Sequence, residues 1–224
     1  MIATPELEKH IINPKKQSQG TVIWMHGLGA DNHDFDSLIP DLCGGDQLPL
    51  KFIFPNAPIR PVTINQHVPM RAWYDVFSLT DLNREDVAGV YQSQNAITQL
   101  IQEEMSDGVP SERIILAGFS QGGAMALFTG MRQQHKLAGI MGLSCYLPLI
   151  HEHPETLFPV NNQTPIFMAH GTHDMTLPLF VGKMGFNAIQ NTHPNIEWRE
   201  YTMQHEISPQ ETKDIHQWIK RILA

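Results

Sequence analysis

The chain of 224 residues is long enough to bury a sizeable core, and its 42% hydrophobic and 17% charged residues are ordinary for a globular enzyme. Its net charge of −8 comes without any basic run, which argues against a nucleic-acid partner. The start lacks a signal-peptide pattern, no apolar stretch could span a bilayer, and two cysteines make no disulfide framework. We therefore expect a cytoplasmic protein with one domain over residues 1–224 and no stable membrane anchoring.

The predicted elements alternate between strands and helices along most of the chain. Apolar runs predict strands at residues 10–12, 21–25, 51–54, 114–117, 137–143 and 165–169, and alternating residues predict a half-exposed strand at 196–201. Helical spacing predicts helices over residues 35–42, 87–107, 124–131, 179–189 and, after a capping box at 208–211, 209–223. This order predicts an α/β fold with a mainly parallel sheet covered by helices on both faces.

Two long segments show no regular period. Residues 56–83 contain several prolines and an aromatic group, so we interpret them as a wall of the substrate site with Trp73 as the leading contact. The alternative, that Trp73 is a core residue, stays open. Residues 145–164 form either a second wall or flap, or a stretch buried under the domain.

The strand at 114–117 leads into Gly118-Phe-Ser-Gln-Gly122, which fits the Gly-x-Ser-x-Gly nucleophile elbow. In an elbow, Ser120 sits on a cramped turn between strand and helix, and glycines remove the Cβ atoms that would collide there. A Gly-rich turn after a buried strand is the alternative. The strand before and the helix after favour Ser120 as a nucleophile.

A serine hydroxyl needs a neighbouring base, and a histidine base needs a carboxylate to hold it. The chain order of an α/β-hydrolase is serine, carboxylate, histidine. Asp174 directly follows a predicted buried strand, whereas Glu155 follows no strand and Asp214 falls inside the last helix. We therefore predict Asp174 as the orienting carboxylate.

Twelve histidines compete for the role of base. His205 follows the last strand and precedes the last helix, at the end of the sheet where Ser120 is expected. His193 precedes that strand, at the opposite end, and His216 is expected on the surface of the last helix. We predict His205 as the base. Three others are predicted to orient loops: His26, His170 and His173.

The remaining chemistry concerns the oxyanion and bound groups. The backbone N–H groups of Gln121 and Leu28 are predicted to stabilise the oxyanion, the first at a helix start and the second in a glycine loop. That loop lacks the third glycine of a dinucleotide site, so no cofactor is expected. His151 and His153 resemble half of a metal site, but no further ligands match, and we expect no metal.

Seven short motifs together resemble one family. They are His26–Asp31, Phe54–Pro58, Arg71–Asp75, Gly118–Gly123, Leu143–Leu147, His170–Asp174 and Tyr201–His205. Their order along nearly the whole chain resembles the acyl-protein thioesterase/lysophospholipase/carboxylesterase family of small α/β-hydrolases. The chain departs at Leu177, where the family usually has valine, and at Cys145, where glycine is frequent.

The resemblance implies a single α/β-hydrolase domain that hydrolyses carboxylic esters or thioesters through an acyl-enzyme, with Ser120, Asp174 and His205 as catalytic triad. It also implies Leu28 and Gln121 as oxyanion donors. We assign three residues to a shallow apolar groove: Trp73, Met70 and Leu147. The expected partner is a small-molecule or lipid acyl ester or an S-acylated protein, and a homodimer stays open. A catalytically silent binding protein and a peptidase are the alternatives.

Overall fold

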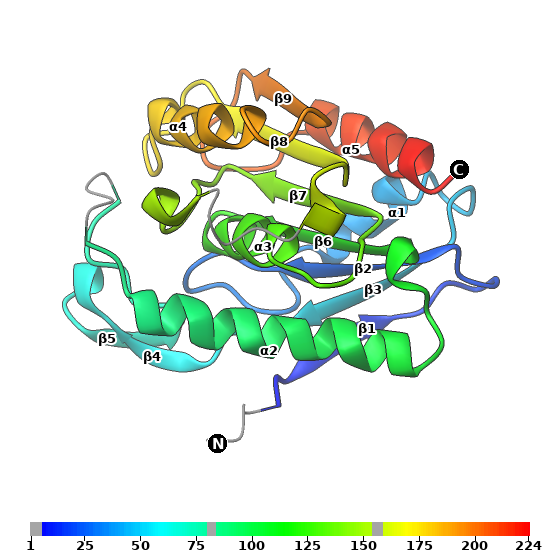
Figure 1. The fold of residues 1–224 in the computed structure, drawn as a ribbon, viewed down its shortest axis with the longest axis horizontal. Helices are drawn as coiled ribbons and strands as arrows, with labels where there is room; N and C mark the ends of the chain where they lie inside the picture. Colours follow the sequence, from blue (N-terminus) through cyan, green and yellow to red (C-terminus); the bar gives the residue numbers. More distant parts are fainter. Residues whose placement is uncertain (1–5, 80–83, 154–158) are drawn as a thin grey trace.

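The computed structural model describes residues 6–79, 84–153 and 159–224. Its main sheet contains β1 (Lys9–Ile12), β2 (Gly20–Met25), β3 (Leu50–Pro55), β6 (Ile114–Phe119), β7 (Gly139–Leu143), β8 (Ile166–Gly171) and β9 (Ile196–Tyr201). The strand order is β1-β3-β2-β6-β7-β8-β9 (Figure 1). Only the edge strand β1 runs antiparallel to its neighbour in this sheet, so the mainly parallel sheet predicted from the sequence is confirmed.

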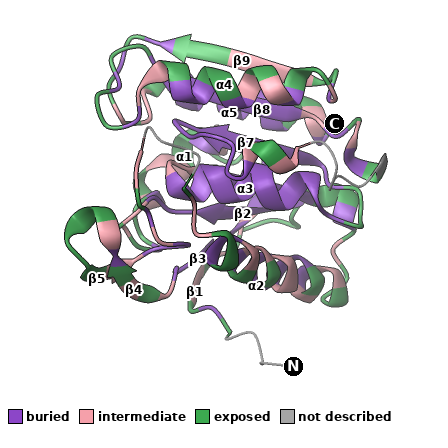
Figure 2. Ribbon diagram, turned by 60° about the vertical axis from the view of Figure 1, so that its left-hand side comes forward, coloured by how far each residue is buried: buried purple, intermediate pink, exposed green. Residues whose placement is uncertain are grey.

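Helices cover both faces of the sheet (Figure 1). They are α1 (Ile39–Leu42), α2 (Val87–Ser106), α3 (Gln121–Met131), α4 (Leu179–Gln190) and α5 (Pro209–Ile222). Ile23 and Met25 of β2 belong to the core on the side of α2, α3 and α4, whereas Val22 and Trp24 belong to the core on the side of α1 and α5. This alternation leaves the central strands and α3 buried, while α2 exposes its outer side (Figure 2).

The last helix begins as the sequence predicts. Ser208 Oγ accepts a hydrogen bond from the backbone N–H of Glu211 at 3.2 Å, and the Glu211 carboxylate accepts one from Ser208 N–H at 3.3 Å. The surface position expected for His216 is wrong. Helix α1 packs against this part of α5, so the His216 ring is buried and its Nδ1 lies 2.8 Å from the Leu42 carbonyl oxygen.

The segment at 56–83, expected as a wall without regular structure, contains a two-stranded hairpin, and its residues 80–83 lie outside the described residues. Strands β4 (Ile59–Val62) and β5 (Val68–Arg71) pair antiparallel with Pro61 opposite Pro69. A two-stranded ribbon has two free edges, so prolines that lack an N–H do not break it. The turn η2 (Thr63–Asn65) is held by Asp75, whose carboxylate accepts from Thr63 N–H at 2.7 Å and from Thr63 Oγ1 at 2.6 Å.

The second irregular segment is partly described. Residues 145–149 are buried beneath the fold, and the short turns η4 (Ile150–Glu152) and η5 (Pro159–Asn161) follow. Glu155, an alternative to Asp174 as the orienting carboxylate, lies outside the described residues. Among the helices that the structure describes, none is both long and apolar enough to cross a membrane.

Candidate active site

Ser120 lies at the sharp turn where β6 ends and α3 begins. Its φ of 54° is a left-handed value that costs free energy for a residue with a side chain, about 1–3 kcal/mol. The turn also brings backbone atoms very close. A Cβ on Gly118 would lie 2.2 Å from the carbonyl group of Gly122, and one on Gly122 would lie 2.2 Å from the carbonyl oxygen of Met25. Glycine is therefore required at both positions.

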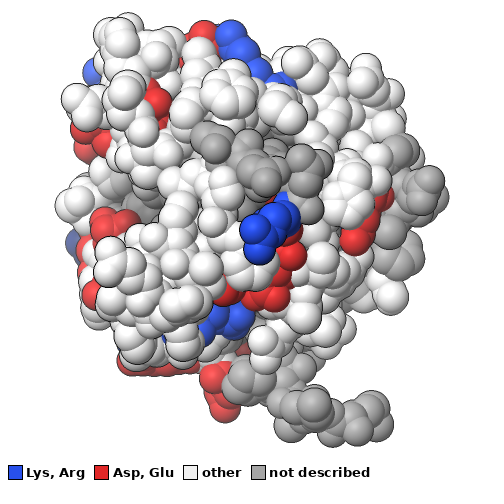
Figure 3. Space-filling view, turned by 90° about the vertical axis from the view of Figure 1, so that its left-hand side faces the viewer, with Lys and Arg blue, Asp and Glu red and all other residues white. Residues whose placement is uncertain are grey.

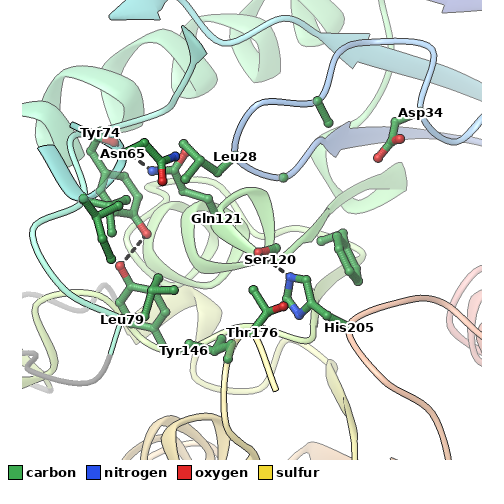
Figure 4. A pocket seen from close by; sticks show the side chains of 16 residues that line it. Leu28, Asp34, Asn65, Tyr74, Leu79, Ser120, Gln121, Tyr146, Thr176 and His205 are labelled. Atoms are coloured by element: carbon green, nitrogen blue, oxygen red, sulfur yellow. Dashed lines mark hydrogen bonds between the residues drawn. The ribbon is translucent and has the colours of Figure 1, made fainter. Parts of the chain in front are cut away.

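The three predicted catalytic side chains meet at the carboxyl end of the sheet. His205 Nε2 lies 2.9 Å from Ser120 Oγ (Figure 4). His205 Nδ1 lies 2.6 Å from Asp174 Oδ2. They come from the loops after β9, β6 and β8, and neighbouring parallel strands end at the same edge. Because a carboxylate accepts at Nδ1, the imidazole carries its proton there and presents Nε2 as an acceptor to the serine hydroxyl.

Asp174 is held rigidly by backbone groups. Its Oδ1 accepts hydrogen bonds from Thr176 N–H at 2.9 Å and Leu177 N–H at 2.8 Å, so Oδ2 is left for His205. His170 lies next to this carboxylate, at 3.4 Å from Oδ2, but its Nε2 is also 2.8 Å from the Leu177 carbonyl. Burial lowers the pKa of His170, which keeps this ring neutral. His170 therefore supports the loop, in line with the role predicted for it.

The predicted oxyanion donors lie on two different elements beside Ser120. Gln121 is the first residue of α3, where backbone N–H groups have no helical partner. Leu28 lies in the loop after β2, and within the described chain no backbone carbonyl accepts from its N–H. Both residues line the same cavity as Ser120 (Figure 4). The two amides are thus available to a developing negative charge.

The side chain of Gln121 ties the helix start to the loop that follows β5. Its Oε1 accepts from Trp73 N–H at 2.9 Å, and its Nε2 donates to the Tyr74 carbonyl at 2.8 Å. Trp73 is fully buried, and its indole N–H donates to the His26 carbonyl at 2.9 Å. His26 Nε2 in turn accepts from Ala57 N–H at 3.0 Å, so this histidine orients loops as predicted.

The three predicted groove residues do not line the cavity beside Ser120. Trp73 lies behind its wall, and the alternative of a core residue describes its position. Leu147 is buried, close to where a side chain on Gly185 of α4 would lie, and Met70 on β5 lies next to Asn65 with its sulfur 3.3 Å from Nδ2.

The cavity itself has a volume of about 340 Å³ and is mostly apolar. Its apolar lining includes Leu28, Ile64, Val76, Leu79, Phe119 and Leu177. Two tyrosines also line it, and Tyr74 and Tyr146 join their hydroxyls at 2.7 Å (Figure 4). Burial raises the pKa of both phenols, so both stay protonated. Tyr74 lies in the motif Arg71–Asp75 and Tyr146 lies in the motif Leu143–Leu147. These two motifs are the sequence signal for the tyrosines.

Other reactive side chains are not among the residues that line the cavity. Burial raises the pKa of the thiols of Cys43 and Cys145, so neither is activated as a nucleophile. His153, considered above as half of a metal site, instead lies 2.9 Å from Thr192 Oγ1, and His151 is exposed. The ring of His153 packs near the ring of His193. Burial lowers the pKa of His193 to about 4.

Comparisons with known proteins identify the family of the chain. Residues 7–223 match the phospholipase/carboxylesterase family. The chain is 37% identical over 218 residues to acyl-protein thioesterase 1 of Yarrowia lipolytica, an alignment that covers 93% of this chain and 94% of the relative.

Solved structures are also similar. The crystal structure of SOBER1 from Arabidopsis thaliana is 27% identical, with a TM-score of 0.86 over 92% of this chain and 99% of that one. Acyl-protein thioesterase 2 of Zea mays is 26% identical, with a TM-score of 0.86 over 97% of this chain and 99% of that one. The chain therefore belongs to the phospholipase/carboxylesterase family of serine hydrolases and has the α/β-hydrolase fold.

Proposed function

We propose that the protein hydrolyses acyl esters or thioesters with Ser120 as nucleophile, His205 as general base and Asp174 as the residue that orients the base. The continuous hydrogen-bonded chain from Ser120 through His205 to Asp174, at the end of an apolar cavity, is the observation that carries the proposal. The distance of 2.9 Å between His205 Nε2 and Ser120 Oγ is within the range needed to transfer the serine proton.

The reaction has two steps. Ser120 Oγ attacks the acyl carbonyl carbon while His205 takes its proton, and the imidazolium is stabilised by Asp174. The carbonyl oxygen becomes an oxyanion held by the backbone N–H groups of Leu28 and Gln121. The imidazolium then donates its proton to the leaving alcohol or thiol, which leaves an acyl-enzyme. Water, deprotonated by His205, attacks the acyl-enzyme, and the imidazolium then returns its proton to Ser120 Oγ as the carboxylic acid leaves.

The substrate proposal rests on the character of the cavity. Its apolar lining suits an acyl chain, and the hairpin residues Ile64 and Asn65 form one side of it. Figure 3 shows the face that carries this hairpin, where most of the surface belongs to residues other than Lys, Arg, Asp and Glu. Together with the relatives named acyl-protein thioesterase, this favours acyl chains on a protein thiol or on a lipid or small-molecule alcohol.

The first experiment tests covalent reactivity of Ser120. Folded protein is treated with a fluorophosphonate, and the adduct is located by mass spectrometry. We expect one adduct on Ser120, none on Ser120→Ala, and strongly slowed labelling of His205→Ala. Asp214→Asn, a carboxylate change on α5, is the matched control and should label normally. Absence of an adduct on the folded wild type would favour a catalytically silent binding protein.

The second experiment defines the bond that is cleaved. Matched oxygen ester, thioester, lysophospholipid and amide substrates of graded acyl length are compared by kcat/KM. We expect turnover of esters and thioesters, and little turnover of amides. Preference for amides would contradict the proposal and support a peptidase. The relative kcat/KM of oxygen esters and thioesters identifies which kind of acyl donor the protein prefers.

A further inference from the structure

A group of two histidines and one carboxylate lies outside the proposed catalytic residues. His10 is on the edge strand β1, His33 follows the glycine loop, and Asp36 begins the short helix η1 (Asp36–Leu38). His33 Nδ1 lies 2.9 Å from Asp36 Oδ2, and His10 Nε2 lies 3.5 Å from Asp36 Oδ1. The two imidazole rings are in contact, with centroids 4.4 Å apart.

The spacing of these groups suits a metal ion. One ligand atom from each residue lies within 4.8 Å of the other two. Ligands at about 2.0–2.1 Å in a tetrahedral zinc site are separated by about 3.3 Å, so small side-chain rotations would close the group around an ion. The side chains are 29%, 62% and 40% exposed for His10, His33 and Asp36, which leaves a path for the ion and room for water.

The carboxylate of Asp36 has an unused acceptor. Its Oδ1 is shielded from solvent, and within the described residues it accepts no hydrogen bond. A bound cation beside the two imidazole rings would satisfy this carboxylate oxygen.

Neighbouring groups restrict the three ligands. The His10 ring packs against Phe54 with a centroid distance of 6.2 Å and an angle of 23° between planes. His33 N–H donates to Asp31 Oδ1 at 2.9 Å, and Asp36 N–H donates to the His33 carbonyl at 3.2 Å. The turn from residue 31 to 36 therefore holds His33 and Asp36 together, and the sheet presents His10 to them.

We propose that His10, His33 and Asp36 bind one divalent transition-metal ion of the zinc type, with water completing its coordination. Imidazole and carboxylate together suit Zn²⁺, Co²⁺ and Ni²⁺ better than Mg²⁺ or Ca²⁺, which prefer oxygen ligands. The ion would join β1 to the segment that follows the loop containing Leu28. Its role is structural, since none of the three side chains lines the cavity beside Ser120.

The test uses full-length, tag-free protein, because a histidine tag would itself bind metal. After treatment with a chelator and its removal, Zn²⁺ alone is titrated by calorimetry, and Co²⁺ is added to follow its visible d–d absorption. We expect one ion per chain, d–d bands of a site with few ligands, and a higher Tm with Zn²⁺. The variants are His10→Ala, His33→Ala and Asp36→Asn, and His135→Ala removes an exposed histidine elsewhere as the control.

Each ligand variant should lose affinity by about tenfold or more, because even indirect partners of a metal are worth 10–100-fold. The control should bind like the wild type, and Zn²⁺ should no longer raise the Tm of His33→Ala. Wild-type protein that binds no metal would overturn the proposal. So would affinity that is unchanged in both His33→Ala and Asp36→Asn, since the bound ion would then belong to other side chains.

Discussion

Burial of Glu211 makes stability depend on pH in a way that can be calculated. This side chain lies in the first turn of α5 and is fully buried, and desolvation raises the pKa of its carboxyl from 4.5 to about 8. The folded state therefore binds a proton on Glu211 more tightly than the unfolded state does. The contribution of this group to the free energy of unfolding is fully present below pH 4.5 and is lost as pH rises toward 8. The difference of 3.5 pKa units (8 − 4.5) corresponds to about 5 kcal/mol.

Glu211→Gln removes the ionisation and keeps an oxygen that can accept from Ser208 N–H. Urea unfolding of wild type and variant should be measured from pH 5 to pH 9. We expect similar free energies of unfolding at pH 5 and a variant more stable by several kcal/mol at pH 9. Glu85, with a pKa raised by burial to about 7, adds a slope common to both proteins. The exposed Glu206→Gln is the control, and equal pH slopes for Glu211→Gln and wild type would refute the reasoning.

Three further changes test the proposed catalytic residues and their support. Asp174→Asn should lower kcat about 10⁴-fold, because an amide favours the wrong tautomer of His205; steady-state rates check this, and a loss under tenfold would contradict it. Trp73→Phe leaves the His26 carbonyl unpaired at a cost of about 1–3 kcal/mol, and we expect a lower Tm and a lower kcat with KM little changed. Gly122→Ala should reduce the free energy of unfolding by about 3 kcal/mol in urea, since its Cβ would lie 2.2 Å from a backbone carbonyl oxygen; unchanged stability would show that the turn can relax.

The central sheet and its helices follow from the sequence because buried parallel strands are short apolar runs with loops at both ends. β6 and β8 are examples, and their ends also place Ser120 and Asp174. The chain order expected of an α/β-hydrolase leaves His193, His205 and His216 as candidate bases, and the place of His205 after the last strand then favours it. In these regions, local pattern and tertiary structure agree.

The wall of the cavity could not be predicted in the same way. Pro61 and Pro69 argue against strands at β4 and β5 when only the sequence is considered. The pairing of Pro61 with Pro69 is visible only in three dimensions. Trp73 faces inward because its indole and backbone find partners on His26 and Gln121, which are distant in sequence. Likewise, His216 is buried only because another helix covers it, and helical spacing does not show this.

The carboxamide of Gln121 has a consequence for how substrates are distinguished. The backbone N–H of Gln121 is a proposed oxyanion donor, and its side chain holds the backbone at Trp73 and Tyr74. Tyr74 also lines the cavity. An acyl group that contacts the Tyr74 ring would therefore contact the segment that is hydrogen-bonded to the Gln121 side chain. The length of the acyl chain should consequently change kcat as well as affinity, so that an acyl group that fits the cavity is hydrolysed faster.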